Sequence, residues 1–140
     1  MKSIVVGTDG SPNAEAAVRR AVEIAKGTGA VVNMVTAFPE THYEAIASSA
    51  RQDKVDMVGV AESVLVRARR AVETEGVEIV THARGGDPAQ VIADIADEQD
   101  ADVIVVGARG LTGVRRFLLG SVASKLTHGA PCDLMIVRQD

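Results

Sequence analysis

The sequence has little cysteine, few aromatic residues and no long apolar run. Its only cysteine, Cys132, cannot form an internal disulfide, so a disulfide-stabilised scaffold is excluded and a structural thiol is the simplest role. Aromatic residues make up 2% of the 140 residues and tryptophan is absent, so the core must consist of valine, isoleucine, leucine and alanine. No apolar run is long enough to span a bilayer, and we expect no membrane partner.

An excess of positive charge is also missing. The formal net charge is −4 and no basic tract occurs, so nucleic acid is not an expected partner. The arginines between positions 67 and 70 are flanked by Glu62 and Glu73, which is typical of a solvated helix face. The sequence enters an apolar strand directly after Met1 and Lys2, without a signal-peptide pattern, so we expect a cytoplasmic protein.

Valine-rich runs alternate with alanine-rich amphipathic runs along the whole chain. An apolar content of 46% excludes a disordered chain, and the alternation predicts a parallel sheet covered by helices. The expected strands cover residues 4–8, 31–37, 77–83, 101–106 and 134–137. The expected helices begin at Pro12 after an N-cap at Ser11, cover 61–72, follow a cap at Asp87, and cover 122–128. Residues 38–55 are interpreted as a loop with some helix at its end. We therefore predict one α/β domain over residues 1–140, an open, doubly wound sheet of five parallel strands.

A glycine-rich stretch from Gly107 to Ser121 lies between the fourth strand and the last helix. The order of strand, glycine-rich loop and helix N-terminus suits an anion, because the first N–H groups of a helix lack partners and its dipole favours negative charge. Glycine lets the backbone approach a phosphate without a Cβ atom in the way. The stretch lacks the Gly-Lys-Ser/Thr of a Walker loop and the Gly-x-Gly-x-x-Gly dinucleotide fingerprint. An ordinary strand-to-helix connection with glycines at its turns is the simpler alternative.

The spacing of Gly107, Gly110, Gly120 and Ser121 resembles the nucleotide-binding loop of the universal stress protein family, in its ATP-binding branch. Further stretches resemble this family along nearly the whole chain: residues 4–11, 86–88, 101–107, 120–122 and 130–137. The resemblance implies the strand order 3-2-1-4-5. In that order the first and fourth strands are neighbours, and their carboxyl ends border the expected ligand crevice.

The resemblance also implies a set of site residues for ATP. Gly107, Gly110, Gly120 and Ser121 would hold the phosphates, with Val122 following in the same motif. Thr8 and Asp9 would lie by the ribose or the phosphates, and Thr36 and Ala37 would border the adenine. Arg109, Arg115 and Arg116 could reach phosphate oxygens, and a solvated loop arginine is the alternative for each.

Asp9 is the expected metal ligand. A carboxylate beside a triphosphate would repel it, so we expect a divalent cation, Mg²⁺, between them. The alternative is that Asp9 only hydrogen-bonds the Gly10-Ser11 turn. The histidines show no metal-ligand spacing, and no catalytic residue is proposed.

Three functions compete. The first is an ATP-binding universal stress protein, a regulatory or protective module with at most slow ATP hydrolysis. The second is an adenylating enzyme, but its Ser-Gly-Gly-x-Asp-Ser signature is replaced here by Gly7-Thr8-Asp9-Gly10-Ser11. The third is a homodimeric interaction module of the same fold that binds no nucleotide, which the loop glycines argue against. A homodimer that pairs the edge strand from Leu134 to Val137 with a second copy is expected in the first and third cases.

Overall fold

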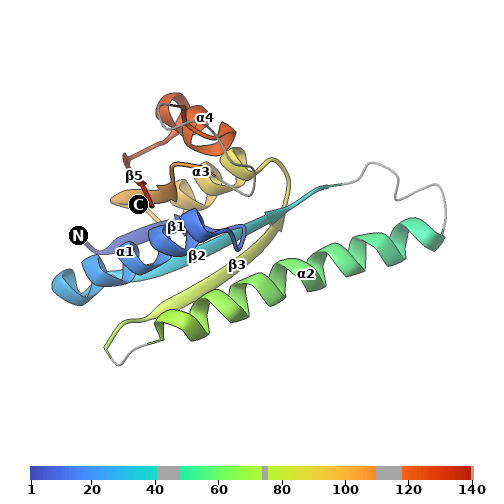
Figure 1. Ribbon diagram of the computed structural model, residues 1–140, viewed down its shortest axis with the longest axis horizontal. Helices are drawn as coiled ribbons and strands as arrows, with labels where there is room; N and C mark the ends of the chain where they lie inside the picture. The colour runs from blue at the N-terminus through green and yellow to red at the C-terminus, as the bar shows by residue number, and fades with distance from the viewer. Residues whose placement is uncertain (41–47, 74–75, 110–117, 140) are drawn as a thin grey trace.

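The computed structural model describes residues 1–40, 48–73, 76–109 and 118–139, with the backbone alone for 48–55. Five parallel strands form one sheet in the order β3-β2-β1-β4-β5 (Figure 1). They are β1 (Ser3–Gly7), β2 (Val31–Phe38), β3 (Ile79–Gly85), β4 (Val103–Gly107) and β5 (Asp133–Val137). The predicted fold class and strand order are confirmed.

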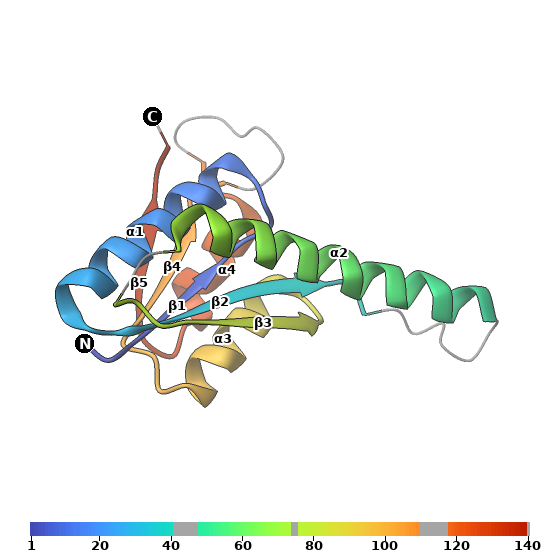
Figure 2. The same ribbon diagram turned by 90° about the horizontal axis from the view of Figure 1, so that it is seen from below.

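Two helices cover each face of the sheet. Helices α1 (Pro12–Thr28) and α2 (Ser48–Val72) lie on one face, and α3 (Pro88–Glu98) and α4 (Ser121–Gly129) lie on the other (Figures 1 and 2). Among the described residues, no helix combines the length and the apolar character needed to cross a bilayer.

Local capping signals set where α1 and α3 begin. The Ser11 hydroxyl accepts the Ala14 N–H at 3.3 Å, and the Asp87 carboxylate accepts the Gln90 N–H at 3.2 Å. A proline follows each cap, where its missing N–H costs nothing. Both predicted caps are confirmed.

Helix α2 begins earlier than the periodicity predicts. It starts at Ser48, inside the stretch 38–55 that was interpreted as a loop with some helix at its end. The apolar period begins only near Ala61 because the first part of α2 extends past the ends of β2 and β3 (Figure 2) and covers no sheet. Strand β3 is also shifted, from the expected 77–83 to Ile79–Gly85, where it pairs with Val32–Phe38 of β2.

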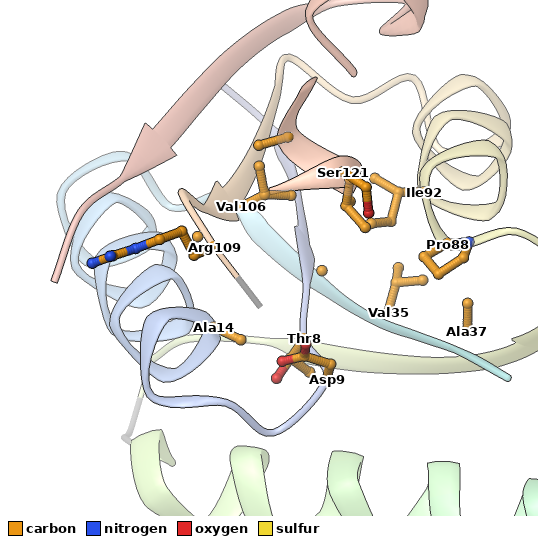
Figure 3. Close-up of a pocket in the computed structure, with 14 residues that line it drawn as sticks. Thr8, Asp9, Ala14, Val35, Ala37, Pro88, Ile92, Val106, Arg109 and Ser121 are labelled. Atoms are coloured by element: carbon orange, nitrogen blue, oxygen red, sulfur yellow. The ribbon is translucent and has the colours of Figure 1, made fainter. Parts of the chain in front are cut away.

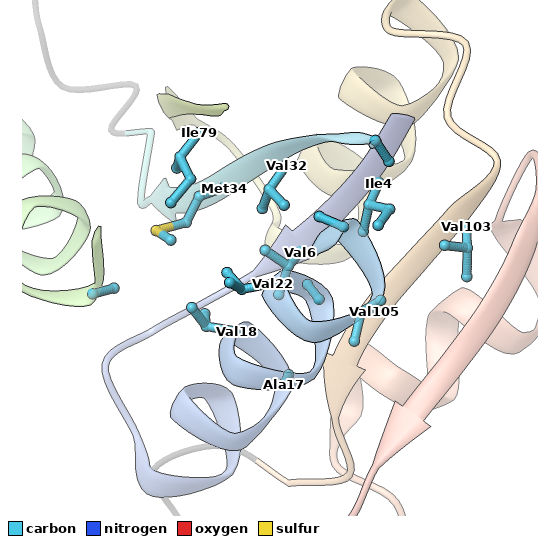
Figure 4. Packing of buried hydrophobic residues seen from close by; sticks show 14 of the residues in the cluster. Ile4, Val6, Ala17, Val18, Val22, Val32, Met34, Ile79, Val103 and Val105 are labelled. Carbon is cyan, nitrogen blue, oxygen red and sulfur yellow. The ribbon is translucent and has the colours of Figure 1, made fainter. Parts of the chain in front are cut away.

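The core has two layers, as expected for a sheet buried on both sides. On the α1 and α2 face, Ile4, Val6 and Val105 are fully buried beneath Val18 of α1 (Figure 4). On the other face, Val5 and Ile104 pack against α3 and α4. Successive strand residues point to opposite faces, so the β-branched runs supply both layers.

Strands β1 and β4 are neighbours, yet the chain leaves them toward opposite faces. After β1 it enters α1, and after β4 it reaches α4 on the other side of the sheet. This divergence opens a crevice at their carboxyl ends, which is where open α/β sheets bind ligands.

Candidate functional site

A cavity of about 260 Å³ lies at the carboxyl ends of the central strands (Figure 3). Seven of the predicted site residues line it: Thr8, Asp9, Ala37, Gly107, Arg109, Ser121 and Val122. They come from β2, β4 and α4 and from the segments that follow β1 and β4, so the fold brings together residues more than a hundred positions apart. Seven more lining residues were not predicted: Gly7, Ala14, Val35, Pro88, Ile92, Val106 and Ala123.

Two predicted residues lie outside the cavity lining. Thr36 is buried outside the cavity lining, where its hydroxyl donates to the Thr8 carbonyl oxygen at 2.7 Å. Gly120 is the N-cap of α4, and its N–H donates to the Ala108 carbonyl at 2.7 Å. Gly110 lies outside the described residues, as do Arg115 and Arg116.

The start of α4 supplies hydrogen-bond donors to the cavity. The first hydrogen bond of this helix runs from the Ser124 N–H to the Gly120 carbonyl, at 3.0 Å. The N–H groups of Ser121, Val122 and Ala123 therefore have no acceptor among the described residues, and all three residues line the cavity. Gly120 offers no side chain to cap them. Such a helix N-terminus binds anions through its free N–H groups and its dipole.

The Asp9 turn faces this helix end across the cavity. One Asp9 carboxylate oxygen accepts the Ser11 N–H at 2.9 Å, and the Thr8 hydroxyl accepts the Gly10 N–H at 3.1 Å. Gly10 has a φ of +83°, which favours glycine. The Asp9 carboxylate therefore hydrogen-bonds the Gly10-Ser11 turn, which was the simpler of its two predicted roles. It is also exposed and lines the cavity, so its second oxygen is accessible to a ligand.

Metal binding at Asp9 would need ligands from outside the protein. Within the described parts of the chain, no group of three or more histidines, cysteines, aspartates or glutamates lies close enough together to hold an ion. Asp9 is the one carboxylate among the described cavity residues, so a cation here would have to share it with ligand oxygens.

The cavity has an apolar end and a polar end. Val35, Ala37, Pro88 and Ile92 form the apolar end, and Figure 3 shows them together on one side. In the same view Thr8 and Asp9 lie below these residues, and Ser121 lies beside Ile92. The Arg109 guanidinium points outward, away from the middle of the cavity (Figure 3).

Close packing demands glycine at one cavity position, Gly107, and a second, Gly7, is tightly packed against a movable side chain. A Cβ atom on Gly107 would lie 2.8 Å from the carbonyl carbon and oxygen of Asn13 in the first turn of α1. A Cβ atom on Gly7 would lie 2.5 Å from a side-chain carbon of Ile92 in α3. The spacing-based interpretation of Gly107 as a phosphate-holding residue therefore omitted its packing role.

An ion pair joins two walls of the site. Lys125 of α4 contacts Asp87, the N-cap of α3, at 3.0 Å. The hydrogen bond from Lys125 and a further one from the Gln90 N–H lower the pKa of the Asp87 carboxyl. Pro88 follows Asp87, and Ser121 lies one helical turn before Lys125, so this pair connects the two helix starts that border the cavity.

The remaining titratable candidates lie elsewhere. His82 contacts the Asn33 side chain at 3.0 Å beneath α3, and burial lowers its pKa. Cys132 is half-buried against the α3 and α4 layer, and burial raises the pKa of its thiol, which agrees with a structural role. Neither residue lines the cavity.

Comparisons with known proteins agree with the fold. A model of the universal stress protein family matches residues 1–138. A Staphylococcus aureus (strain USA300) universal stress protein is 33% identical over 141 residues, which cover 99% of this chain and 85% of that protein. UspA from Lactobacillus plantarum has a TM-score of 0.84 at 26% identity, with 98% and 97% of the two chains covered. A universal stress protein solved in complex with cAMP has a TM-score of 0.74 at 31% identity, with 99% and 98% covered.

The family match spans nearly the whole chain, and the observed sheet order is the one that the resemblance to this family implied. This chain therefore belongs to the universal stress protein family.

Proposed function

We propose that this protein binds ATP together with Mg²⁺ in the cavity at the carboxyl ends of β1 and β4. In this proposal the protein acts as a nucleotide-dependent regulatory or protective module of the stress response. The observation that carries the proposal is the start of α4. There Ser121, Val122 and Ala123 present to the cavity three N–H groups that have no acceptor within the described parts of the chain.

The polarity of the cavity orients the nucleotide. The phosphates would bind the α4 N-terminus, and the adenine would lie among Val35, Ala37, Pro88 and Ile92. A second hollow, of about 420 Å³, shares Ala37 and Pro88 with the cavity and so adjoins its base end. A related protein solved with cAMP supports an adenine ligand for this fold.

Asp9 favours a metal-bound polyphosphate over a bare one. Its carboxylate faces the proposed phosphate position and would repel it, unless a cation contacts both. ATP brings such a cation, whereas AMP or cyclic AMP binds Mg²⁺ less readily through a single phosphate. The preference for ATP rests on this argument.

Fast hydrolysis is not expected. A general base must reach the attacking water, and Asp9 is the one candidate among the described cavity residues. Asp9 already accepts the Ser11 N–H and would also contact the cation. We therefore expect at most slow ATP hydrolysis. A slow rate suits a protein that acts through its nucleotide-bound state.

The test is calorimetric titration of the protein with ATP, AMP and cyclic AMP, each with and without Mg²⁺. We expect ATP to bind best and to need Mg²⁺. The same titrations on Ser121→Asp should weaken ATP binding by at least about tenfold, or about 1.4 kcal/mol, because the new carboxylate occupies the anion position. An acidic residue at a helix start stabilises the helix by about 0.3–1 kcal/mol, so misfolding would not explain the loss.

Ser124→Asp is the matched control. Ser124 is exposed on the same helix and lies outside the cavity lining, so this variant should bind ATP like the wild type. Absence of ATP binding by the wild type would refute the proposal. In that case the homodimeric interaction module of the same fold becomes the better function, since β5 offers a half-buried apolar edge at Leu134 and Ile136.

A further inference from the structure

A groove separates α1 from α2 on the outer surface of the protein. It has a volume of about 100 Å³ and involves none of the nucleotide cavity's lining residues. Val18 and Ala68 form its buried floor, and the half-buried Val64 and Val72 form its sides. Because its floor and sides are apolar, the groove suits one branched aliphatic side chain.

Two arginines flank this groove from opposite helices. Arg19 comes from α1 and Arg67 from α2, and both are exposed. Neither forms an ion pair among the described residues, whereas Arg20 pairs with Glu23 at 3.6 Å and Arg84 pairs with Glu98 at 2.8 Å. The two guanidinium groups therefore keep their hydrogen-bonding capacity for a ligand.

The rim also contains one acidic residue, Glu15, one helical turn before Arg19. A negatively charged ligand is therefore attracted by Arg19 and Arg67 and repelled by Glu15. The net charge of the rim is positive in a protein whose net charge is −4. With two arginines and one glutamate, the rim favours an acidic partner over a basic one.

We propose that this groove binds a segment of a partner protein in which one aliphatic side chain is flanked by carboxylates. The aliphatic side chain fills the space above Val18 and Ala68, and the carboxylates pair with Arg19 and Arg67. Arginine forms bidentate hydrogen bonds with carboxylates, which fixes the position of the segment along the groove. A nucleic acid could pair its phosphates with the same arginines, but it has no aliphatic group for the apolar floor.

The test uses a defined probe and the whole protein. The probe is a short peptide with one leucine flanked on both sides by glutamates. Its binding is followed by amide chemical shifts in ¹⁵N-labelled protein during titration. We expect saturable shifts at Val18, Arg19, Val64 and Ala68. Replacing the leucine of the probe by serine, or its glutamates by lysines, should abolish them.

Matched variants separate this groove from general electrostatic attraction. Arg19→Gln/Arg67→Gln should weaken binding of the peptide about tenfold, which corresponds to about 1.4 kcal/mol. Arg20→Gln/Arg69→Gln removes the same charge from the same helices but outside the groove, and should bind the peptide like the wild type. Ala71→Leu adds a side chain at an exposed position of the groove wall, and should block binding without any change of charge.

Several results would overturn the proposal. One is an absence of shifts at the groove residues with the leucine-glutamate peptide. Another is equal weakening in the two arginine pairs, which would mean that only net charge matters. A third is displacement of the peptide by a single-stranded oligothymidine that shifts the same amides, since nucleic acid would then be the better occupant.

Discussion

Gly107 at the end of β4 lies directly against Asn13 in the first turn of α1. A Cβ atom added to Gly107 would meet the carbonyl carbon and oxygen of Asn13 at 2.8 Å. Backbone atoms cannot move aside as a flexible side chain can. This contact sets the distance between the β4 end and the α1 start, which border the same cavity.

Gly107→Ala should therefore destabilise the protein. Overpacking of this kind costs about 1–3 kcal/mol, measured as the free energy of unfolding in urea. Gly27→Ala is the control, since no atom lies within 4 Å of its added Cβ and the residue lies inside α1. That variant should be neutral or more stable by up to about 1 kcal/mol. Equal stability of the two variants would show that the close contact with Asn13 carries no energetic weight.

Asp9→Asn should separate the two roles of Asp9. Asparagine keeps an oxygen that can accept the Ser11 N–H, so the turn and the stability of the protein should be retained. The charge that favours a cation is lost, so ATP binding should lose most of its dependence on Mg²⁺. Titrations with and without Mg²⁺ measure this. A variant as dependent on Mg²⁺ as the wild type would remove Asp9 from the proposed metal site.

The sequence predicted the sheet and the helix caps because these depend on local patterns. Runs of β-branched residues mark the strands, and Ser11 and Asp87 are followed by prolines that begin helices. The α2 start could not be predicted from periodicity, because residues 48–60 extend beyond the sheet and need no continuous apolar stripe. Good helix formers such as Ala50, Gln52 and Lys54 were the available signal.

The same distinction between local sequence patterns and tertiary packing explains which site residues could be predicted. Asp9, Gly107 and Ser121 were found because they follow strands or begin a helix at the carboxyl edge. Thr36 and Ala37 differ because neighbouring strand residues face opposite ways, so that Val35 and Ala37 line the cavity and Thr36 does not. Ala14, Pro88 and Ile92 reach the cavity only through helix packing, for which the sequence carries no direct signal.

Asp87→Asn should remove a contribution to stability that depends on pH. The folded-state pKa of Asp87 is lowered, chiefly by Lys125, so its contribution is present above the unfolded-state pKa of about 3.9. It is lost as the pH falls through the folded-state value. Asparagine still caps α3, so at neutral pH the variant should lose only the partly exposed ion pair, at most about 1 kcal/mol. Urea unfolding at about pH 7 and about pH 3 should show a larger difference between variant and wild type at the higher pH.

The His82→Gln variant should lose less stability than the wild type as the pH falls below neutral. Burial lowers the folded-state pKa of His82 below its unfolded value of about 6.5, so the unfolded chain is protonated first as the pH falls. Stability is therefore full above about pH 6.5 and decreases toward the folded-state pKa. Glutamine can still donate to the Asn33 side-chain oxygen, now 3.0 Å from the imidazole, and it does not titrate. Unfolding curves between about pH 7 and pH 5 should be flatter for the variant. Identical slopes would exclude His82 as the cause.

Ile136→Pro should dissociate a dimer built on β5. The Ala108 N–H donates to the Val137 carbonyl, so Val137 and the alternate residue Met135 bond toward β4, while the N–H of Ile136 points to the open edge. Proline removes that outward N–H and is tolerated at such an edge position. Ile136→Ala is the control, because it removes the same half-buried side chain and keeps the N–H. By sedimentation, the wild type and Ile136→Ala should be dimers and Ile136→Pro a monomer, with circular dichroism confirming that both variants fold. A dimeric Ile136→Pro would show that the two copies do not associate through the hydrogen bonds of this edge.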